Sequence, residues 1–124
     1  MTDGGPLDGL RVLVVEDDLL VAEVLTDMLT DAGAEVVGPF GWVDEAVEAV
    51  KIGERRLNSA VLDINLHGDK SYPIADELKA RNVPFVFVTG YAGETIPPSY
   101  RTIPRCGKPF DQEQLIALLA DAVR

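Results

Sequence analysis

The sequence predicts an α/β fold in which a doubly wound, five-stranded parallel sheet carries helices on both faces. Five short runs rich in Val, Ile, Leu and Phe alternate with patterns of helical periodicity along the 124 residues. These runs lack the polar–apolar alternation of half-exposed strands, which indicates strands buried on both faces, as in parallel sheets. The chain length suits a single domain with one sizeable core.

The first half of the chain contains two predicted strand–helix units. Residues 12–15 form the first strand, and a helix follows whose apolar stripe is ended by Gly33. Residues 34–38 form the second strand, closed by a Gly-Pro pair, and residues 43–51 form the second helix. The apolar stripe of the first helix comprises Val21, Val24, Leu25, Met28 and Ala32.

The second half continues the same alternation. Residues 59–64 and 85–88 have the composition of buried strands, and residues 102–106 form a weaker strand. A helix over residues 72–81, with Ser71 as its cap, must end before the next proline. The pattern therefore predicts the third, fourth and fifth strands and the third helix.

The segment between the last two strands is poor helix material. Residues 90–101 contain Pro97 and Pro98 and leave little room for two loops and a helix. The fourth helix is therefore expected to be short, distorted or mobile. The last helix begins at Asp111, and Gln114 three residues later resembles a capping box. Its predicted buried stripe comprises Leu115, Leu118, Leu119 and Ala122.

Composition and charge exclude several classes of protein. Apolar residues make up 47% and charged residues 26% of the chain, which is the balance of a folded globular protein. The formal net charge of −10 argues against partners such as nucleic acid or an anionic membrane surface. No apolar run has the length of a membrane span, and no signal peptide is visible. With Cys106 as the single cysteine, a cytoplasmic location is expected. Residues 1–9 are expected to be a flexible leader to one domain over residues 10–124.

Polar side chains follow the predicted strands at the point where each strand ends. Glu16, Asp17 and Asp18 come after the first strand, and Asp63 ends the third. The last two strands contribute Thr89, Gly90, Lys108 and Pro109. Because the carboxyl ends of parallel strands meet at one edge of the sheet, these residues are expected to lie together.

The grouping of these residue types indicates phosphoryl chemistry. Clustered carboxylates repel one another unless a cation lies between them, and oxygen ligands suit Mg²⁺. The hydroxyl of Thr89 can donate a hydrogen bond to a phosphoryl oxygen, and the ammonium of Lys108 can neutralise another. A carboxylate placed between metal and phosphoryl group can itself be the nucleophile, which gives an aspartyl phosphate.

Four motifs in this order resemble the receiver domain of bacterial two-component response regulators. They are the segment of residues 12–18, Asp63, Thr89, and the Lys-Pro-Phe run of residues 108–110. The resemblance covers residues 10–124 and implies a flavodoxin-like (βα)5 fold. It further implies that a histidine kinase or histidine phosphotransfer protein is the partner and that Mg²⁺ is the cofactor.

The resemblance assigns roles to individual residues. Asp63 matches the phosphoacceptor, and Glu16 and Asp17 match the acidic pair that holds Mg²⁺ together with it. Asn65 stands where the family lends a backbone carbonyl to the metal. Thr89, followed by Gly90, matches the switch hydroxyl. Lys108 matches the phosphate-binding lysine, and the family usually has a cis peptide before Pro109.

A narrower resemblance and one departure concern the later motifs. Residues 84–91 are similar to the fourth-strand motif of the FATGUY receivers, with Val88 where that motif has Ala. Tyr91 stands at a position that tunes dephosphorylation in the family. Most receivers carry Tyr or Phe three residues before the lysine, whereas this chain has Arg105. This difference suggests the hypothesis that activation orders or reshapes residues 90–104 in place of an aromatic switch.

The preferred interpretation is a stand-alone receiver that is not a turnover enzyme. It would signal by protein contact, pass phosphate along a relay, or act as a phosphate sink. One alternative is a pseudo-receiver that binds a partner without phosphorylation. Another is a Mg²⁺-dependent phosphohydrolase of the haloacid dehalogenase type, which needs an acid where this chain has Asn65. A third alternative is a flavodoxin-like cofactor binder. It would need a Gly-rich or Ser/Thr-rich phosphate loop after the first strand, and this chain has none there.

Two residues outside these motifs are given ordinary interpretations. His67 is expected to be an exposed loop histidine, because a metal site needs a second His or Cys and none accompanies it. Trp42, at the start of the second predicted helix, is expected to serve in packing.

Overall fold

The computed structural model describes residues 5–53, 56–90 and 96–123. Its centre is a five-stranded sheet in the order β2-β1-β3-β6-β7, in which every neighbouring pair is parallel. The strands are β1 (Arg11–Val15), β2 (Glu35–Phe40), β3 (Ser59–Asp63), β6 (Phe85–Thr89) and β7 (Arg105–Gly107). The predicted parallel sheet is therefore confirmed.

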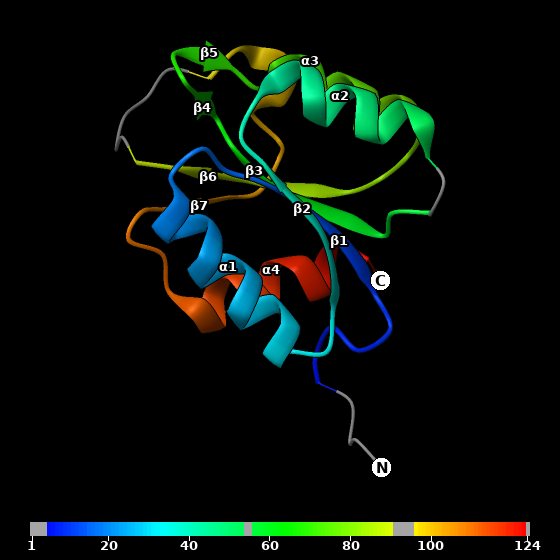
Figure 1. Cartoon of the computed structure of the whole chain (residues 1–124), viewed down its shortest axis with the longest axis vertical. Coiled ribbons are helices and arrows are strands. Elements are labelled where there is room, and N and C mark those ends of the chain that lie inside the picture. Colours follow the sequence, from blue (N-terminus) through cyan, green and yellow to red (C-terminus); the bar gives the residue numbers. More distant parts are fainter. Residues whose placement is uncertain (1–4, 54–55, 91–95, 124) are drawn as a thin grey trace.

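Helices cover both faces of the sheet (Figure 1). On one face lie α1 (Leu19–Asp31) and α4 (Gln112–Ala122), and on the other lie α2 (Val43–Ile52) and α3 (Tyr72–Ala80). Two apolar clusters fill the layers: side chains of α1 and α4 enter one, and those of α2 and α3 enter the other. Both β3 and β6 are buried along their whole length, as the uninterrupted apolar runs predicted.

Two strand boundaries differ from the sequence-based prediction. The second strand does not end at Gly38 but continues to Phe40, because Gly38 adopts φ 105 and the register shifts, so that Phe40 pairs with Val15. The last strand begins at Arg105 rather than at residue 102. The residues before it belong to a short turn, which the 3-10 helix η1 (Pro98–Tyr100) opens.

The connection between β6 and β7 carries one helical turn in its described part. This turn is η1, and residues 91–95, where the fourth helix was also expected, lie outside the described residues. Tyr100 anchors the turn: its ring stacks on that of Tyr72 at 4.6 Å, and its hydroxyl donates a hydrogen bond to Asp76. In the described part of this connection the helical structure is thus short, as the prolines predicted.

The N-terminal leader was only partly anticipated. Leu7 is fully buried, and its backbone N–H donates to the carbonyl of Ala32 at the end of α1 at 2.9 Å. Leu7 therefore packs against the domain, while Pro6, Asp8 and Gly9 are exposed, and the flexible leader over residues 1–9 stays a prediction. A single leucine among small and polar neighbours offered no periodicity from which this burial could be inferred.

The buried faces of α1 and α4 also differ in detail from the predicted stripes. In α1 the buried residues are Ala22, Leu25, Met28 and Leu29, whereas Val24 is 54% exposed. Apolar residues surround much of this helix, so the sequence alone did not determine which of them face the sheet. In α4 the fully buried residues are Leu115 and Leu119, and Leu118 is half-buried.

The N-caps of α1 and α4 make side-chain hydrogen bonds, whereas the N-cap of α3 does not. Asp18 and Asp111 cap α1 and α4, and each accepts hydrogen bonds from two backbone N–H groups. Ser71 precedes α3 but makes no side-chain cap bond; its carbonyl oxygen instead accepts from Ile74. None of the described helices is long and apolar enough to cross a membrane.

A small antiparallel hairpin follows β3 and was not predicted. It consists of β4 (Asn65–Leu66) and β5 (Asp69–Lys70), joined by His67 and Gly68. Both turn residues have positive φ, 50 and 87, as two-residue hairpin loops of this kind require. The Gly after His67 was the one sequence signal for this turn.

Candidate functional site

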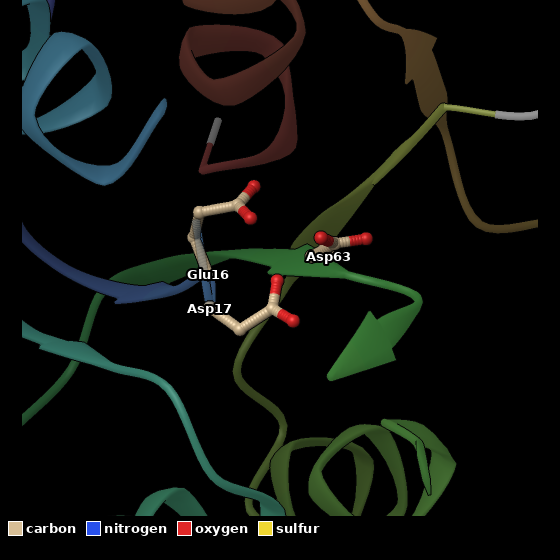
Figure 2. A group of neighbouring side chains, drawn as sticks. All are labelled: Glu16, Asp17 and Asp63. Atoms are coloured by element: carbon tan, nitrogen blue, oxygen red, sulfur yellow. The ribbon is translucent and has the colours of Figure 1, made fainter. Parts of the chain in front are cut away.

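Three carboxylates meet at the carboxyl edge of the sheet (Figure 2). Glu16 and Asp17 follow β1, and Asp63 ends the neighbouring strand β3. The parallel pairing of Val15 with Leu62 brings these strand ends side by side. One oxygen atom from each carboxylate lies within 4.8 Å of the other two. The topology thus unites two segments that are far apart in the sequence.

Lys108 connects two of these carboxylates. Its Nζ lies 2.9 Å from Asp63 Oδ2 and 2.8 Å from Glu16 Oε1. Its backbone N–H donates to the carbonyl of Thr89 at 2.8 Å, which ties the residues after β7 to the end of β6. Glu16 is 2% and Asp63 6% exposed, so the ammonium group offsets the burial of negative charge.

The pKa values reflect this burial and pairing. Burial raises the pKa of Glu16 to about 7, and the nearby charge of Asp63 adds to the rise, although Lys108 and the Asp18 N–H oppose it. Burial also acts on Asp17, but hydrogen bonds, the first of them from the His67 N–H, bring its pKa below the usual value. Burial acts to lower the pKa of Lys108, yet its two carboxylate partners raise it.

The β4–β5 hairpin closes one side of the cluster. Its first residue, Asn65, donates its backbone N–H to Asp63 Oδ1 at 3.2 Å. Lys70 Nζ donates to Asn65 Oδ1 at 2.6 Å, and the His67 N–H donates to Asp17 Oδ2 at 2.9 Å. Two of the three carboxylates are therefore oriented by backbone N–H groups of one short segment.

Two further predicted site residues, Thr89 and Gly90, lie at the same edge of the sheet as the carboxylates. Thr89 is buried at the end of β6, one position beyond Val88, which pairs with Asp63. A Cβ built on the exposed Gly90 would lie 4.0 Å from Cδ of Lys108, which places Gly90 at the same edge. The Lys108–Pro109 peptide is cis, as the resemblance implied.

Arg105 is not part of this grouping. Arg105 is exposed at the start of β7, where it pairs with Phe87 two residues before Thr89. It is an edge-strand residue, and the described ion pairs with Glu16 and Asp63 are made by Lys108 instead. Tyr91 lies outside the described residues.

The donor set suits a hard divalent cation. It consists only of oxygen atoms, two of the three carboxylates are buried, and one amine partner leaves negative charge in excess. Mg²⁺ prefers such oxygen ligands and keeps several waters, which the half-buried Asp17 side of the cluster permits. The residues present therefore fit a magnesium ion.

Comparison with known proteins decides the family. The sequence model of the response regulator receiver domain matches residues 12–120. The chain belongs to the response regulator receiver family. Receiver domains are signalling modules of two-component systems, in which an aspartate accepts a phosphoryl group, and the acidic cluster of this chain agrees with that function.

Relatives and solved structures support this assignment. The chain is 28% identical to the transcriptional regulatory protein PdtaR of Mycobacterium tuberculosis, over 98% of its own length and 60% of PdtaR. It is 33% identical to nodulation protein W of Bradyrhizobium diazoefficiens, over 91% of its length and 51% of that protein. The chain thus spans only about half of these curated relatives.

Among solved structures, SdrG of Sphingomonas melonis Fr1 has a TM-score of 0.77 and 36% identity, covering 89% of this chain and 95% of SdrG. The BeF3-activated conformation of SdrG, from Pseudomonas melonis Fr1, has a TM-score of 0.76 and 33% identity over 99% of this receiver and all of that chain.

A ring stack near the site of this receiver was not expected from the sequence. The ring of Trp42 stacks on that of His67, with centroids 3.7 Å apart and planes 13° from parallel. His67 is exposed, as predicted, but its backbone also contacts Asp17. The two residues are 25 positions apart, and no local pattern in the sequence links them.

Proposed function

We propose that this receiver accepts a phosphoryl group on Asp63 from a histidine kinase or histidine phosphotransfer protein, with Mg²⁺ as cofactor. The observation that carries the proposal is the position of Lys108 Nζ, within 2.9 Å of Asp63 and 2.8 Å of Glu16. A cation that already neutralises the acceptor carboxylate is placed to neutralise a phosphoryl oxygen added to it.

In the proposed reaction each group has a defined task. An oxygen of Asp63 forms a bond to phosphorus while the phosphorus–nitrogen bond of the donor phosphohistidine breaks, and the imidazole leaves. Lys108 and the hydroxyl of Thr89 bind phosphoryl oxygens. Mg²⁺, held by Glu16, Asp17, Asp63 and the carbonyl of Asn65, would supply positive charge to the transferred group.

The comparison with SdrG supports the proposal. Beryllium trifluoride bound to a carboxylate has the shape and charge distribution of a phosphoryl group. SdrG, whose sequence in that structure is 33% identical to this chain, has been solved in a BeF3-activated conformation. We place the conformational response of this chain in residues 90–104, because Arg105 stands where an aromatic switch residue is usual. Membership of the FATGUY subgroup, with Tyr91 and Arg105 as modulators, remains a prediction.

We further propose a cytoplasmic signalling protein rather than a turnover enzyme. Its output would be a protein contact, transfer of the phosphoryl group to a relay partner, or storage of phosphate as a sink. PdtaR is named a transcriptional regulatory protein and TorS of Escherichia coli a sensor protein, so related receivers occur in proteins of different output.

Intact-mass analysis after incubation with Mg²⁺ and acetyl phosphate tests the proposal. The wild-type protein is expected to gain one phosphoryl group, Asp63→Asn none, and EDTA is expected to prevent the gain. Asp69→Asn is the matched control, because Asp69 is an exposed aspartate in the nearby hairpin. It should be phosphorylated like the wild type.

Two other results would favour the alternatives. No gain from acetyl phosphate or from a phosphorylated kinase, together with no Mg²⁺ binding, would indicate a pseudo-receiver. Steady hydrolysis of p-nitrophenyl phosphate would indicate a phosphohydrolase, although Asn65 lacks the acidic group which that reaction needs.

A further inference from the structure

We infer that Trp42 is a positioning residue for the metal site: its ring holds the tip of the β4–β5 hairpin so that the His67 N–H orients Asp17. The inference rests on the proposed binding of Mg²⁺ and names a residue outside the receiver motifs. Its basis is a continuous set of contacts from the start of α2 to a carboxylate of the cluster.

The first contact joins the hairpin to the cluster. The His67 N–H donates to Asp17 Oδ2 at 2.9 Å across 50 positions of sequence. This bond occupies one oxygen of a carboxylate that lies within 4.8 Å of its two acidic neighbours. Hydrogen bonds of this kind set the direction in which a ligating carboxylate faces a metal.

The hairpin by itself is a weak support for that bond. Each of its strands has two residues, and isolated two-stranded hairpins are marginally stable. Moreover, His67 adopts φ 50, a conformation that non-glycine residues rarely take unless their surroundings hold them there. The position of the His67 N–H therefore depends on contacts made by the rest of the residue.

The stack with Trp42 supplies those contacts. The two rings lie 3.7 Å apart and nearly parallel. Trp42 is itself placed by its neighbours: the carbonyl of Phe40 accepts from the Glu16 N–H at 2.9 Å, and a Cβ on Gly41 would lie 3.6 Å from Asp17 Cα. The segment before α2 thus runs directly beside the acidic loop and presents the indole to the hairpin tip.

The exposure of Trp42 makes this role separable from core packing. Its side chain is 49% exposed, so truncation opens no buried cavity. Ile52, the last residue of α2, is 58% exposed and lies at the opposite end of this helix from its N-cap Trp42, which makes Ile52→Ala a matched control. Trp42→Phe retains an aromatic ring and should restore the stack.

The experiment measures Mg²⁺ affinity by calorimetric titration and hydrogen exchange of the His67 amide by NMR. Trp42→Ala is expected to weaken Mg²⁺ binding about tenfold, at the lower end of what loss of an outer-shell partner causes. It should also speed exchange of the His67 amide severalfold. Trp42→Phe and Ile52→Ala should leave both values near those of the wild type.

The outcomes separate this inference from the proposed function. If the wild-type protein does not bind Mg²⁺, the proposed metal site is wrong. If it binds but Trp42→Ala binds equally well, or the His67 amide exchanges no faster, the role of Trp42 is wrong. His67→Gly gives a second test, since glycine keeps the N–H and favours positive φ but removes the ring. It should also weaken binding.

Discussion

At the scale of the residue, the site is a balance of buried charges. Glu16 and Asp63 are almost fully buried beside one another, and Lys108 contacts both. Without a metal, one ammonium group faces three clustered carboxylates. Burial raises the pKa of Glu16 to about 7 and the neighbouring charge of Asp63 adds to the rise, because protonation removes one buried negative charge.

This balance predicts how stability depends on pH without metal. The pKa of Glu16 is about 7 in the folded chain against an ordinary 4.5, so the folded state binds more protons between these values. The contribution of Glu16 to the free energy of unfolding is fully present below pH 4.5 and is lost as the pH rises through about 7. Urea unfolding should show a loss of about 2 kcal/mol between pH 5 and pH 8.

The control for this prediction is Glu16→Gln, which cannot titrate and should remove most of the pH dependence. Asp17 does not interfere in this window, since its lowered pKa contributes stability that is lost only as pH falls below about 4. A wild-type stability that rises from pH 5 to pH 8 would contradict the assignment.

At the scale of the element, short segments support the site from outside the sheet. The hairpin after β3 presents two N–H groups to Asp63 and Asp17, and the N-terminal turn packs on the end of α1. Helix α1 begins directly after the acidic pair, with Asp18 as its cap. The packing of α1 therefore affects the segment that carries Glu16 and Asp17.

The N-terminal turn is expected to be part of the folding unit. Leu7→Ala should lower the free energy of unfolding by about 2 to 4 kcal/mol, because the side chain is fully buried in the cluster of α1 and α4. Leu19→Ala is the matched control, since Leu19 is 84% exposed and its loss should change stability by about 0.5 kcal/mol or less. Equal urea midpoints for the two variants would contradict the packing of this turn.

At the scale of the whole molecule, the net charge of −10 and the acidic edge favour binding of a divalent cation. Whatever binds the folded state alone stabilises it by mass action. A magnesium ion at the cluster would therefore couple the local site to the stability of the entire domain.

Thermal unfolding with and without Mg²⁺ checks this coupling. A concentration of MgCl₂ one hundred times the Kd should add about 2.7 kcal/mol of stability, which raises Tm by several degrees. NaCl at equal ionic strength controls for general screening, and Asp17→Asn should remove most of the magnesium effect. An equal response of both proteins to both salts would mean that no specific site exists.

Much of this molecule followed from local sequence. The buried runs predicted β1, β3 and β6, because strands covered on both faces must be continuously apolar. The order of strands and helices placed Glu16, Asp17, Asp63, Thr89 and Lys108 at one edge, since parallel strands end together.

Contacts between distant segments could be decided only by the tertiary structure. The burial of Leu7, the exposure of Val24 and the stack of Trp42 on His67 each depend on which element lies opposite, and local periodicity carries no such information. The 2.8 and 2.9 Å contacts of Lys108 are of the same kind. Sequence thus determined which chemical groups reach the carboxyl edge of the sheet, while packing between elements determined how those groups are oriented and charged.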